Sequence, residues 1–271
     1  MTIPPSSDFL TIAVKAAQRA GDIILENMGK ITKDDIGLKQ AADFVTRVDR
    51  EAEENIIAII RKNFPDHLFL AEESLRETGA GQYRWIIDPL DGTTNFIHTY
   101  PVFSVSIALE HRGDIITGVI FDPLRKELFT AERGRGAFLN GRAIFISAVT
   151  DAKDSLVTTG FPFRRKEILD KYLLLFKNVL LTVSDLRRAG SAALDLASVA
   201  SGRCEAFFEI GLSPWDMAAG SLLIKEAGGV VTDFGGGSDY LLTGNIVAGN
   251  PALHPLLLKE VQEVFEGQLA S

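Results

Sequence analysis

Residues 85–95 have the sequence Trp-Ile-Ile-Asp-Pro-Leu-Asp-Gly-Thr-Thr-Asn, and the fold and chemistry of the chain are best predicted from this stretch. Its apolar start predicts a buried strand that ends at Asp88, and α/β sheets tend to bind ligands at the carboxyl ends of their strands. The proline and the glycine favour a tight turn, on which Asp88 and Asp91 can converge on one cation. At the expected helix start that follows, the amides of Gly92 and Thr93 can bind an anion. Taken alone, the stretch also fits an ordinary turn after a strand.

Three further acids stand in patterns that allow either a functional or a structural interpretation. Glu72 follows the predicted strand 68–71, a position where acids usually belong to a solvated loop. Asp216 ends a Ser-Pro-Trp-Asp segment, in which it completes a capping box at the start of a predicted helix. Asp49 ends the segment Asp-Phe-Val-Thr-Arg-Val-Asp and would, by itself, be a surface acid on a helix.

The order of the predicted elements indicates α/β or α+β layers, in which helices pack on mixed sheets. Residues 30–42 are charged and aperiodic and predict a mobile loop, whereas Asn140-Gly141 predicts a tight hairpin. We expect a single domain over residues 1–271, with a soft boundary between lobes 1–148 and 149–271. The predicted helices cover residues 8–29, 43–64, 165–180, 191–201, 214–227 and a last helix after Asn250, and the predicted strands cover residues 68–71, 83–87, 102–110, 115–121 and 204–209.

Composition narrows the class of protein. A chain of 271 residues with 46% hydrophobic residues can bury a large core, and the single Cys204 excludes an internal disulfide or a Cys-rich metal site. Apolar runs of about five residues are far too short to span a membrane, and a cytoplasmic location is expected. The net charge of −8 argues against nucleic acid as a partner. There is no P-loop motif, and no histidine stands in a metal-ligand context.

Considered together, the acidic segments resemble the inositol monophosphatase family of magnesium-dependent, lithium-sensitive phosphatases. The resemblance spans essentially the whole chain, and its most specific part is the Asp-Pro-Leu-Asp-Gly-Thr run combined with a distal Trp-Asp-x-Ala-Ala-Gly. It implies a layered αβαβα sandwich, with metal and phosphate bound by the first lobe and the substrate pocket in the second. The matching segments are DFVTRVD (43–49), AEES (71–74), WIIDPLDGTTNF (85–96), GSAA (190–193), FFEIG (207–211) and WDMAAG (215–220).

The resemblance also implies which residues hold metal ions. Glu72, Asp88 and the backbone carbonyl of Leu90 would bind a first Mg²⁺. Asp88, Asp91 and Asp216 would bind a second. A set of carboxylates without histidine or cysteine suits a hard ion such as Mg²⁺ or Mn²⁺, and the clustered acids would repel one another without cations.

The remaining implied roles concern catalysis. Thr93, paired with Asp49, would orient the attacking water together with Glu72. The amides of Gly92 and Thr93 would bind phosphate oxygens. A weaker third ion would contact Glu72, with Lys39 nearby. The expected reaction is a single in-line displacement that releases phosphate from a monoester.

In the family, the substrate pocket is lined at positions that correspond here to Asp91, Gly190, Ser191, Ala192 and Glu209. The resemblance therefore implies a phosphorylated polyol, such as myo-inositol 1-phosphate, as the substrate. Fructose 1,6-bisphosphate or another sugar phosphate is the alternative. Arginines that could bind a second phosphate, line a dimer interface or simply pair with nearby acids stand at positions 164, 165, 187 and 188.

Two expectations about partners rest on the resemblance alone. The first is a homodimer. The second belongs to another functional class: some bacterial members of the family bind the transcription machinery, so an interaction protein, with or without catalysis, is the alternative to an enzyme.

Overall fold

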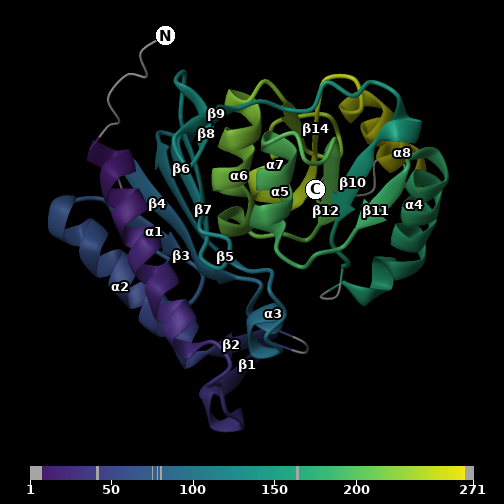
Figure 1. Cartoon of the computed structure of the whole chain (residues 1–271). Helices are drawn as coiled ribbons and strands as arrows, with labels where there is room; N and C mark the ends of the chain where they lie inside the picture. The colour runs from purple at the N-terminus through teal and green to yellow at the C-terminus, as the bar shows by residue number, and fades with distance from the viewer. Residues whose placement is uncertain are drawn as a thin grey trace.

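The computed structural model describes residues 8–40, 43–74, 76–77, 79, 81–162 and 165–265. Within this part of the chain, helices and sheets alternate in the five layers of an αβαβα sandwich, which confirms the predicted fold class (Figure 1). Each pair of neighbouring layers encloses buried apolar side chains. No described helix has the combination of length and apolar character that a membrane span requires.

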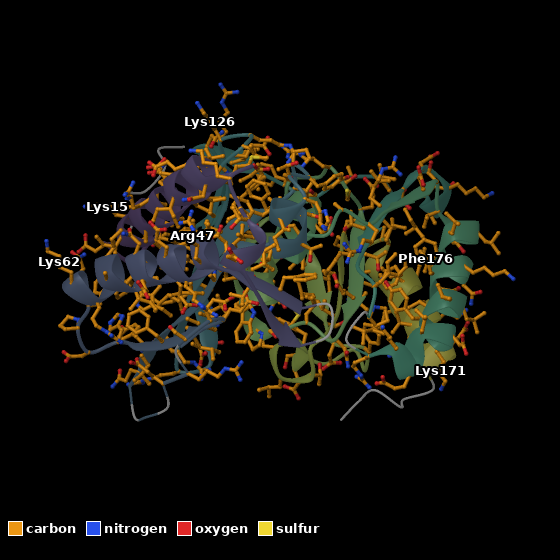
Figure 2. The ribbon with its side chains drawn as sticks, turned by 90° about the horizontal axis from the view of Figure 1, so that it is seen from below. Lys15, Arg47, Lys62, Lys126, Lys171 and Phe176 are labelled. Atoms are coloured by element: carbon orange, nitrogen blue, oxygen red, sulfur yellow. The ribbon has the colours of Figure 1, made fainter. Side chains whose placement is uncertain are left out.

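The first large sheet has the strand order β3-β4-β5-β6-β7-β8-β9. Strands β3 and β4 are parallel, and each later neighbour is antiparallel. Helices α1 (Asp8–Asn27) and α2 (Arg47–Asn63) cover its outer face, and Lys15 and Lys62 extend from these two helices into solvent (Figure 2). The strands are β3 (Leu68–Ala71), β4 (Tyr83–Asp91), β5 (Ser104–His111), β6 (Asp114–Asp122), β7 (Glu127–Glu132), β8 (Gly136–Leu139) and β9 (Arg142–Ile144).

Helices α5 (Ala192–Ala200) and α6 (Pro214–Glu226) form the middle layer, between the two sheets. The second sheet has the order β11-β10-β12-β14-β13, and α4 (Leu169–Thr182) and α8 (His254–Phe265) cover its far face. Its strands are β10 (Leu156–Thr159), β11 (Asp185–Arg187), β12 (Ala206–Ile210), β13 (Val230–Thr232) and β14 (Asn245–Gly249). The short elements are α3 (Thr93–Ile97), α7 (Tyr240–Thr243), η1 (Lys33–Asp35), η2 (Ala152–Asp154) and η3 (Lys166–Ile168).

The predicted helix over residues 43–64 was wrong at its start. Asp43–Thr46 forms strand β2, which pairs with β1 (Ile36–Gln40) inside the segment predicted as a loop. The helix begins after Thr46, because the Thr46 side chain accepts hydrogen bonds from the first turn and Asp49 accepts one from the Thr46 amide, 2.8 Å away. A capping box therefore sets this boundary.

Strand β4 is longer than predicted. It continues through Asp88 to Asp91, with a register irregularity opposite β5 between these two residues. The hairpin at Asn140-Gly141 is confirmed: both residues have positive φ, 49° and 76°, as a two-residue turn between β8 and β9 requires. The division into lobes at residue 148 stays a prediction.

Candidate active site

Three carboxylates from distant parts of the chain converge in one cluster. Asp88, Asp91 and Asp216 each place an oxygen within 4.8 Å of the other two. Asp88 and Asp91 lie on β4 and are buried, whereas Asp216 stands in the first turn of α6 and is partly exposed. The cluster thus lies where the first sheet meets the middle helical layer.

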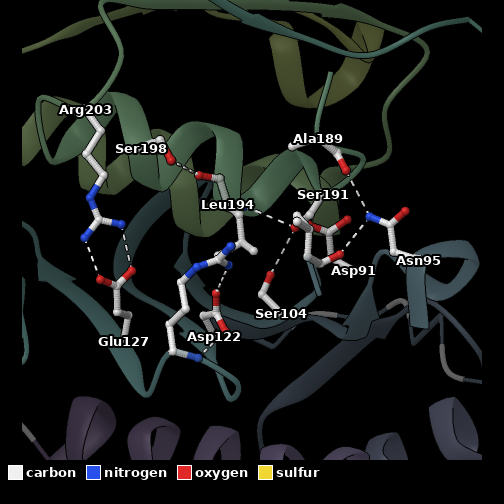
Figure 3. A network of polar contacts seen from close by, with 12 residues as sticks. Asp91, Asn95, Ser104, Asp122, Glu127, Ala189, Ser191, Leu194, Ser198 and Arg203 are labelled. Carbon is white, nitrogen blue, oxygen red and sulfur yellow. Dashed lines mark hydrogen bonds and ion pairs between the residues drawn. The ribbon is translucent and has the colours of Figure 1, made fainter. Parts of the chain in front are cut away.

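Asp91 is held by the start of α5. Its Oδ2 accepts a hydrogen bond from Ser191 Oγ, which lies beside it in Figure 3, and a second one of 2.8 Å from the Ala193 amide. Ser191 is also the N-cap of α5, and its hydroxyl lies 3.4 Å from that of Ser104, which is opposite Asp91 in the sheet. One carboxylate oxygen of Asp91 is therefore fixed by polar contacts that connect the sheet to the middle layer.

Asp216 caps α6 and also belongs to the acidic cluster. Its Oδ2 accepts a hydrogen bond of 2.6 Å from the Ser213 amide, which completes the capping box of α6. The neighbouring Trp215 carbonyl accepts a hydrogen bond of 3.1 Å from Ser106, and Ser106 is opposite Asp88 in the β4–β5 register. The capping bond from Ser213 and the bond from Ser106 to the Trp215 carbonyl together place Asp216 beside Asp88.

Glu72 lies at the end of β3 and interacts electrostatically with Asp88. The segment around it is held by Glu53 of α2, a buried acid that the sequence analysis missed. Glu53 accepts a 2.8 Å hydrogen bond from the Glu73 amide and a short one from the Ser74 hydroxyl. The helical periodicity of α2 places Glu53 on the apolar face of that helix. This position was the signal in the sequence that Glu53 is buried.

The cluster is electrostatically unfavourable when it carries only its own charges. Burial raises the pKa of Asp91 to about 6, and it raises the pKa of Asp88 well above its usual range, with the charges of Glu72, Asp91 and Asp216 adding to the effect. A divalent cation would remove this penalty. The donors are all oxygen atoms, which are the ligands that Mg²⁺ prefers, so the residues present fit such an ion.

Thr93 and Asp49 form a hydrogen-bonded pair beside the cluster. Thr93 Oγ1 donates to Asp49 Oδ1 at 2.8 Å and lies 3.1 Å from the Leu90 carbonyl. Asp49 is fully buried, and burial raises its pKa to about 6 although Thr46 and Thr93 donate hydrogen bonds to it. Because the Thr93 hydrogen points at Asp49, the lone pairs of the hydroxyl can accept a bond from another molecule.

The turn before α3 has no room for a side chain at Gly92. Gly92 has φ of +98°, and a Cβ there would lie 2.9 Å from the Val102 carbonyl. Asn95 connects this turn to the second half of the chain, because its Nδ2 donates to the Ala189 carbonyl at 3.0 Å (Figure 3). The same Nδ2 also donates to the Val102 carbonyl at 2.8 Å. Asn95 was not among the predicted site residues.

A cavity of about 390 Å³ opens above the acidic cluster. Arg188 also lines it, whereas Arg165 pairs with Glu167 and Arg187 pairs with Asp185, as the structural interpretation of the arginines expects. Arg164 and the side chain of Lys39 lie outside what the structure describes. The predicted site residues that line the cavity are Glu72, Asp88, Leu90, Asp91, Gly92, Thr93, Gly190, Ser191, Ala192, Glu209 and Asp216.

Glu209 lies on β12, lines the same cavity and is buried. Its carboxylate packs directly against the backbone of Gly160, where an added Cβ would lie only 1.9 Å from Glu209 Oε1. The Gly160 carbonyl accepts a hydrogen bond from Tyr172, whose hydroxyl also bonds to Thr159. The end of β10 thereby fixes the wall against which Glu209 rests.

Comparison with known proteins agrees with this geometry. The model of the inositol monophosphatase family matches residues 6–266. The chain belongs to the inositol monophosphatase family. It is 49% identical to Nus factor SuhB of Escherichia coli K12 over 96% of this chain and 98% of that protein. SuhB of Bartonella henselae superposes with a TM-score of 0.92 at 45% identity, over 95% of this chain and 99% of that one. The inositol monophosphatase of Anabaena gives 0.85 at 40% identity, over 94% and 95%.

Members of this family are magnesium-dependent phosphatases, and the position of Glu53 leads to a testable prediction. Glu53→Gln should raise the Mg²⁺ concentration for half-maximal activity by about tenfold, because the amide can no longer accept both bonds that hold the Glu72 segment. Calorimetric titration with Mg²⁺ would measure the affinity directly. Glu54→Gln, a change at the exposed neighbour on α2, is the control, and equal affinities in the two variants would contradict the role of Glu53.

Proposed function

We propose that this chain is a magnesium-dependent phosphomonoesterase that hydrolyses inositol monophosphates, with myo-inositol 1-phosphate as the representative substrate. The observation that carries the proposal is the convergence of Asp88, Asp91 and Asp216 within 4.8 Å, in the lining of a cavity that Glu209 also lines. An enzyme for a phosphorylated polyol needs acids that bind the metal ions and a hydrogen-bond acceptor that binds the hydroxyls of the substrate.

The metal ions would be held by residues that the fold already gathers. Glu72, Asp88 and the Leu90 carbonyl would hold one ion, and Asp88, Asp91 and Asp216 the other, with Lys39 near a weaker third ion. When bound, Mg²⁺ supplies Lewis-acid stabilisation of the phosphate and lowers the pKa of water. Burial of Asp88 and Asp91 keeps competing water away from the carboxylates.

Thr93 and Asp49 would position the nucleophile together with Glu72. The Thr93 hydroxyl donates a hydrogen bond to Asp49, so its oxygen would accept one from the attacking water and orient a lone pair of that water toward phosphorus. As the water is deprotonated, the Thr93 hydroxyl can take up that proton and pass its own to Asp49 Oδ1. The raised pKa of Asp49, about 6, suits an acceptor near neutral pH.

The rest of the cavity would bind the ester. The amides of Gly92 and Thr93 donate to phosphate oxygens, while the backbone at Gly190, Ser191 and Ala192 lines the space for the leaving group. Glu209 accepts hydrogen bonds from its hydroxyls. An alcohol with several hydroxyls is therefore favoured over an aromatic or nucleotide leaving group.

The test is phosphate release by the purified chain with Mg²⁺, across inositol 1-phosphate, fructose 1,6-bisphosphate, a hexose 1-phosphate and 2′-AMP. We expect the highest kcat/KM on inositol 1-phosphate, and inhibition by lithium. A preference for fructose 1,6-bisphosphate would instead make the chain a sugar bisphosphatase, and Arg188, which lines the cavity, would then be a candidate to bind the second phosphate.

Glu209 provides a sharper prediction. Glu209→Gln should lower kcat/KM on inositol 1-phosphate by about tenfold or more, because a charge-assisted hydrogen bond contributes roughly 1.5–3 kcal/mol. Hydrolysis of p-nitrophenyl phosphate, whose leaving group has no hydroxyls, should hardly change. Gly160→Ala is a matched variant: it keeps the carboxylate but displaces it, and should produce the same selective loss. Equal losses on both substrates would mean that Glu209 supports the fold or the metal ions.

A second function is supported by the relatives. Several proteins 44–49% identical to this chain carry the name Nus factor SuhB, which fits a contact with the transcription machinery. We therefore propose that the chain also binds a bacterial transcription complex. A cytoplasmic location and a homodimer are part of the same proposal. Binding of the immobilised chain to purified RNA polymerase, measured with wild type and with the catalytically impaired Asp91→Asn, tests it. Binding by both variants would make this role independent of catalysis.

A further inference from the structure

A second acid lies in the wall of the cavity and was not among the predicted site residues. Asp195, in the first turn of α5, lines the cavity together with Glu209, and only 4% of its surface is exposed. The two carboxylates are close enough to repel each other. Arg188 lines the same cavity and is the cation that acts on Asp195. The lining of the cavity thus includes two buried acids and an arginine.

Asp195 differs from the other buried acids in its partners. Asp91 accepts hydrogen bonds from Ser191 and Ala193, and Glu205 accepts one of 2.6 Å from the Leu156 amide. Within the described part of the chain, no hydrogen bond to the Asp195 side chain is found. Burial raises the pKa of Asp195 well above its usual range, and the charges of Glu209 and Asp91 add to this effect. Buried acids are normally hydrogen-bonded, so this one lacks a partner that a ligand can provide.

We propose that Asp195 and Glu209 together form a subsite for two hydroxyls of the substrate. This inference rests on the proposed function and deepens it. A subsite of two carboxylates selects phosphorylated polyols or sugars that carry at least two hydroxyls besides the phosphate ester. A hydroxyl donates to a carboxylate without adding charge. A second phosphate is repelled by the two acids, and a cationic group is disfavoured because Arg188 already acts on Asp195. A neutral polyol is the ligand class that remains.

The test compares Asp195→Ala with wild type on myo-inositol 1-phosphate and on p-nitrophenyl phosphate, with Mg²⁺ present. We expect KM for inositol 1-phosphate to rise and kcat/KM to fall by about tenfold, with less than a twofold change on p-nitrophenyl phosphate. Asp195→Asn keeps one acceptor oxygen and should recover part of the loss. Glu205→Gln is the matched control, a buried acid at the neighbouring strand that does not line the cavity, and it should leave the ratio of the two activities unchanged.

The outcomes separate this inference from the proposed function. One outcome overturns the inference alone: the wild type hydrolyses inositol 1-phosphate, and Asp195→Ala has the same ratio of activities on inositol 1-phosphate and p-nitrophenyl phosphate as the wild type. Equal losses on both substrates also overturn it, because Asp195 would then support the metal cluster through α5. If Asp195→Ala does not fold, the KM of Asp195→Asn for inositol 1-phosphate is the test. A KM equal to that of the wild type would overturn the inference. Wild type inactive on every polyol and sugar phosphate overturns the proposed function together with the subsite.

Discussion

Replacing Asp91 by asparagine is expected to lower the turnover of inositol 1-phosphate by at least three orders of magnitude. The substitution barely changes the shape of the side chain, but it removes a charge that the proposed metal site requires. The hydrogen bonds from Ser191 and Ala193 go to a single oxygen of Asp91, so the amide oxygen of asparagine can keep both. The loss of turnover should therefore come from weaker metal binding and catalysis, because the start of α5 is left intact. Phosphate release at saturating Mg²⁺ measures it.

The same variant should be at least as stable as wild type when no metal is present. The pKa of Asp91 is raised in the folded state to about 6, so its ionisation destabilises the fold as the pH rises above about 4, and the penalty is complete above about pH 6. At pH 7.5 in a chelator, Tm of Asp91→Asn should stay level or rise by a few degrees. Near pH 4 the gain should vanish.

A matched control distinguishes this result from a general effect of removing a buried acid. Asp122 is also buried, but Arg125 donates to it at 2.6 Å and it lies outside the cavity lining. Asp122→Asn should therefore lower Tm and leave kcat unchanged. Near-normal magnesium-dependent activity of Asp91→Asn would contradict the assignment of the metal site.

Replacing Thr93 by alanine is the second change with a large expected effect. Removal of the hydroxyl breaks the connection from the water to Asp49, and general acid–base groups of this kind typically contribute 10²–10⁴-fold. We expect kcat to fall within that range while KM changes by less than about threefold, since the backbone amides that bind phosphate remain. Steady-state kinetics on inositol 1-phosphate separates the two parameters.

Two companion variants make the Thr93 result interpretable. Thr93→Ser keeps the hydroxyl and should restore most of kcat. Thr182→Ala removes a threonine hydroxyl from the exposed end of α4 and should have no effect. A loss confined to KM in Thr93→Ala would make Thr93 a phosphate-binding residue and would remove it from water activation.

Local sequence was enough to predict the long helices and five of the strands. Periodicity and the flanking Gly29 predicted α1, and the Asn140-Gly141 pair predicted the β8–β9 hairpin, because these signals depend on backbone preferences within a few residues. The errors occurred where pairing between segments decides the structure. Residues 43–46 fit a helix or a strand equally well until β1 lies beside them.

The candidate site shows the same division. The carboxylates that cluster were predicted from their motifs and the family resemblance, but Asp216 had an equally good local explanation as a helix cap. Only the β4–β5 register and the contact of Ser106 with the Trp215 carbonyl bring that cap beside Asp88. Glu53 and Asp195 were missed because each lies in an ordinary helical sequence, and their significance comes from what faces them.

The sequence by itself determined the family, the layered fold class and the acids available for metal binding, since these follow from local patterns and from motifs of contiguous residues. Only the tertiary structure decided that Asp88, Asp91 and Asp216 share one site, that Thr93 donates to Asp49, and that Asp195 faces the cavity beside Glu209. The physical reason is distance along the chain: contacts such as that between Asp91 and Ser191, which are 100 residues apart, exist only once the middle helices pack between the two sheets.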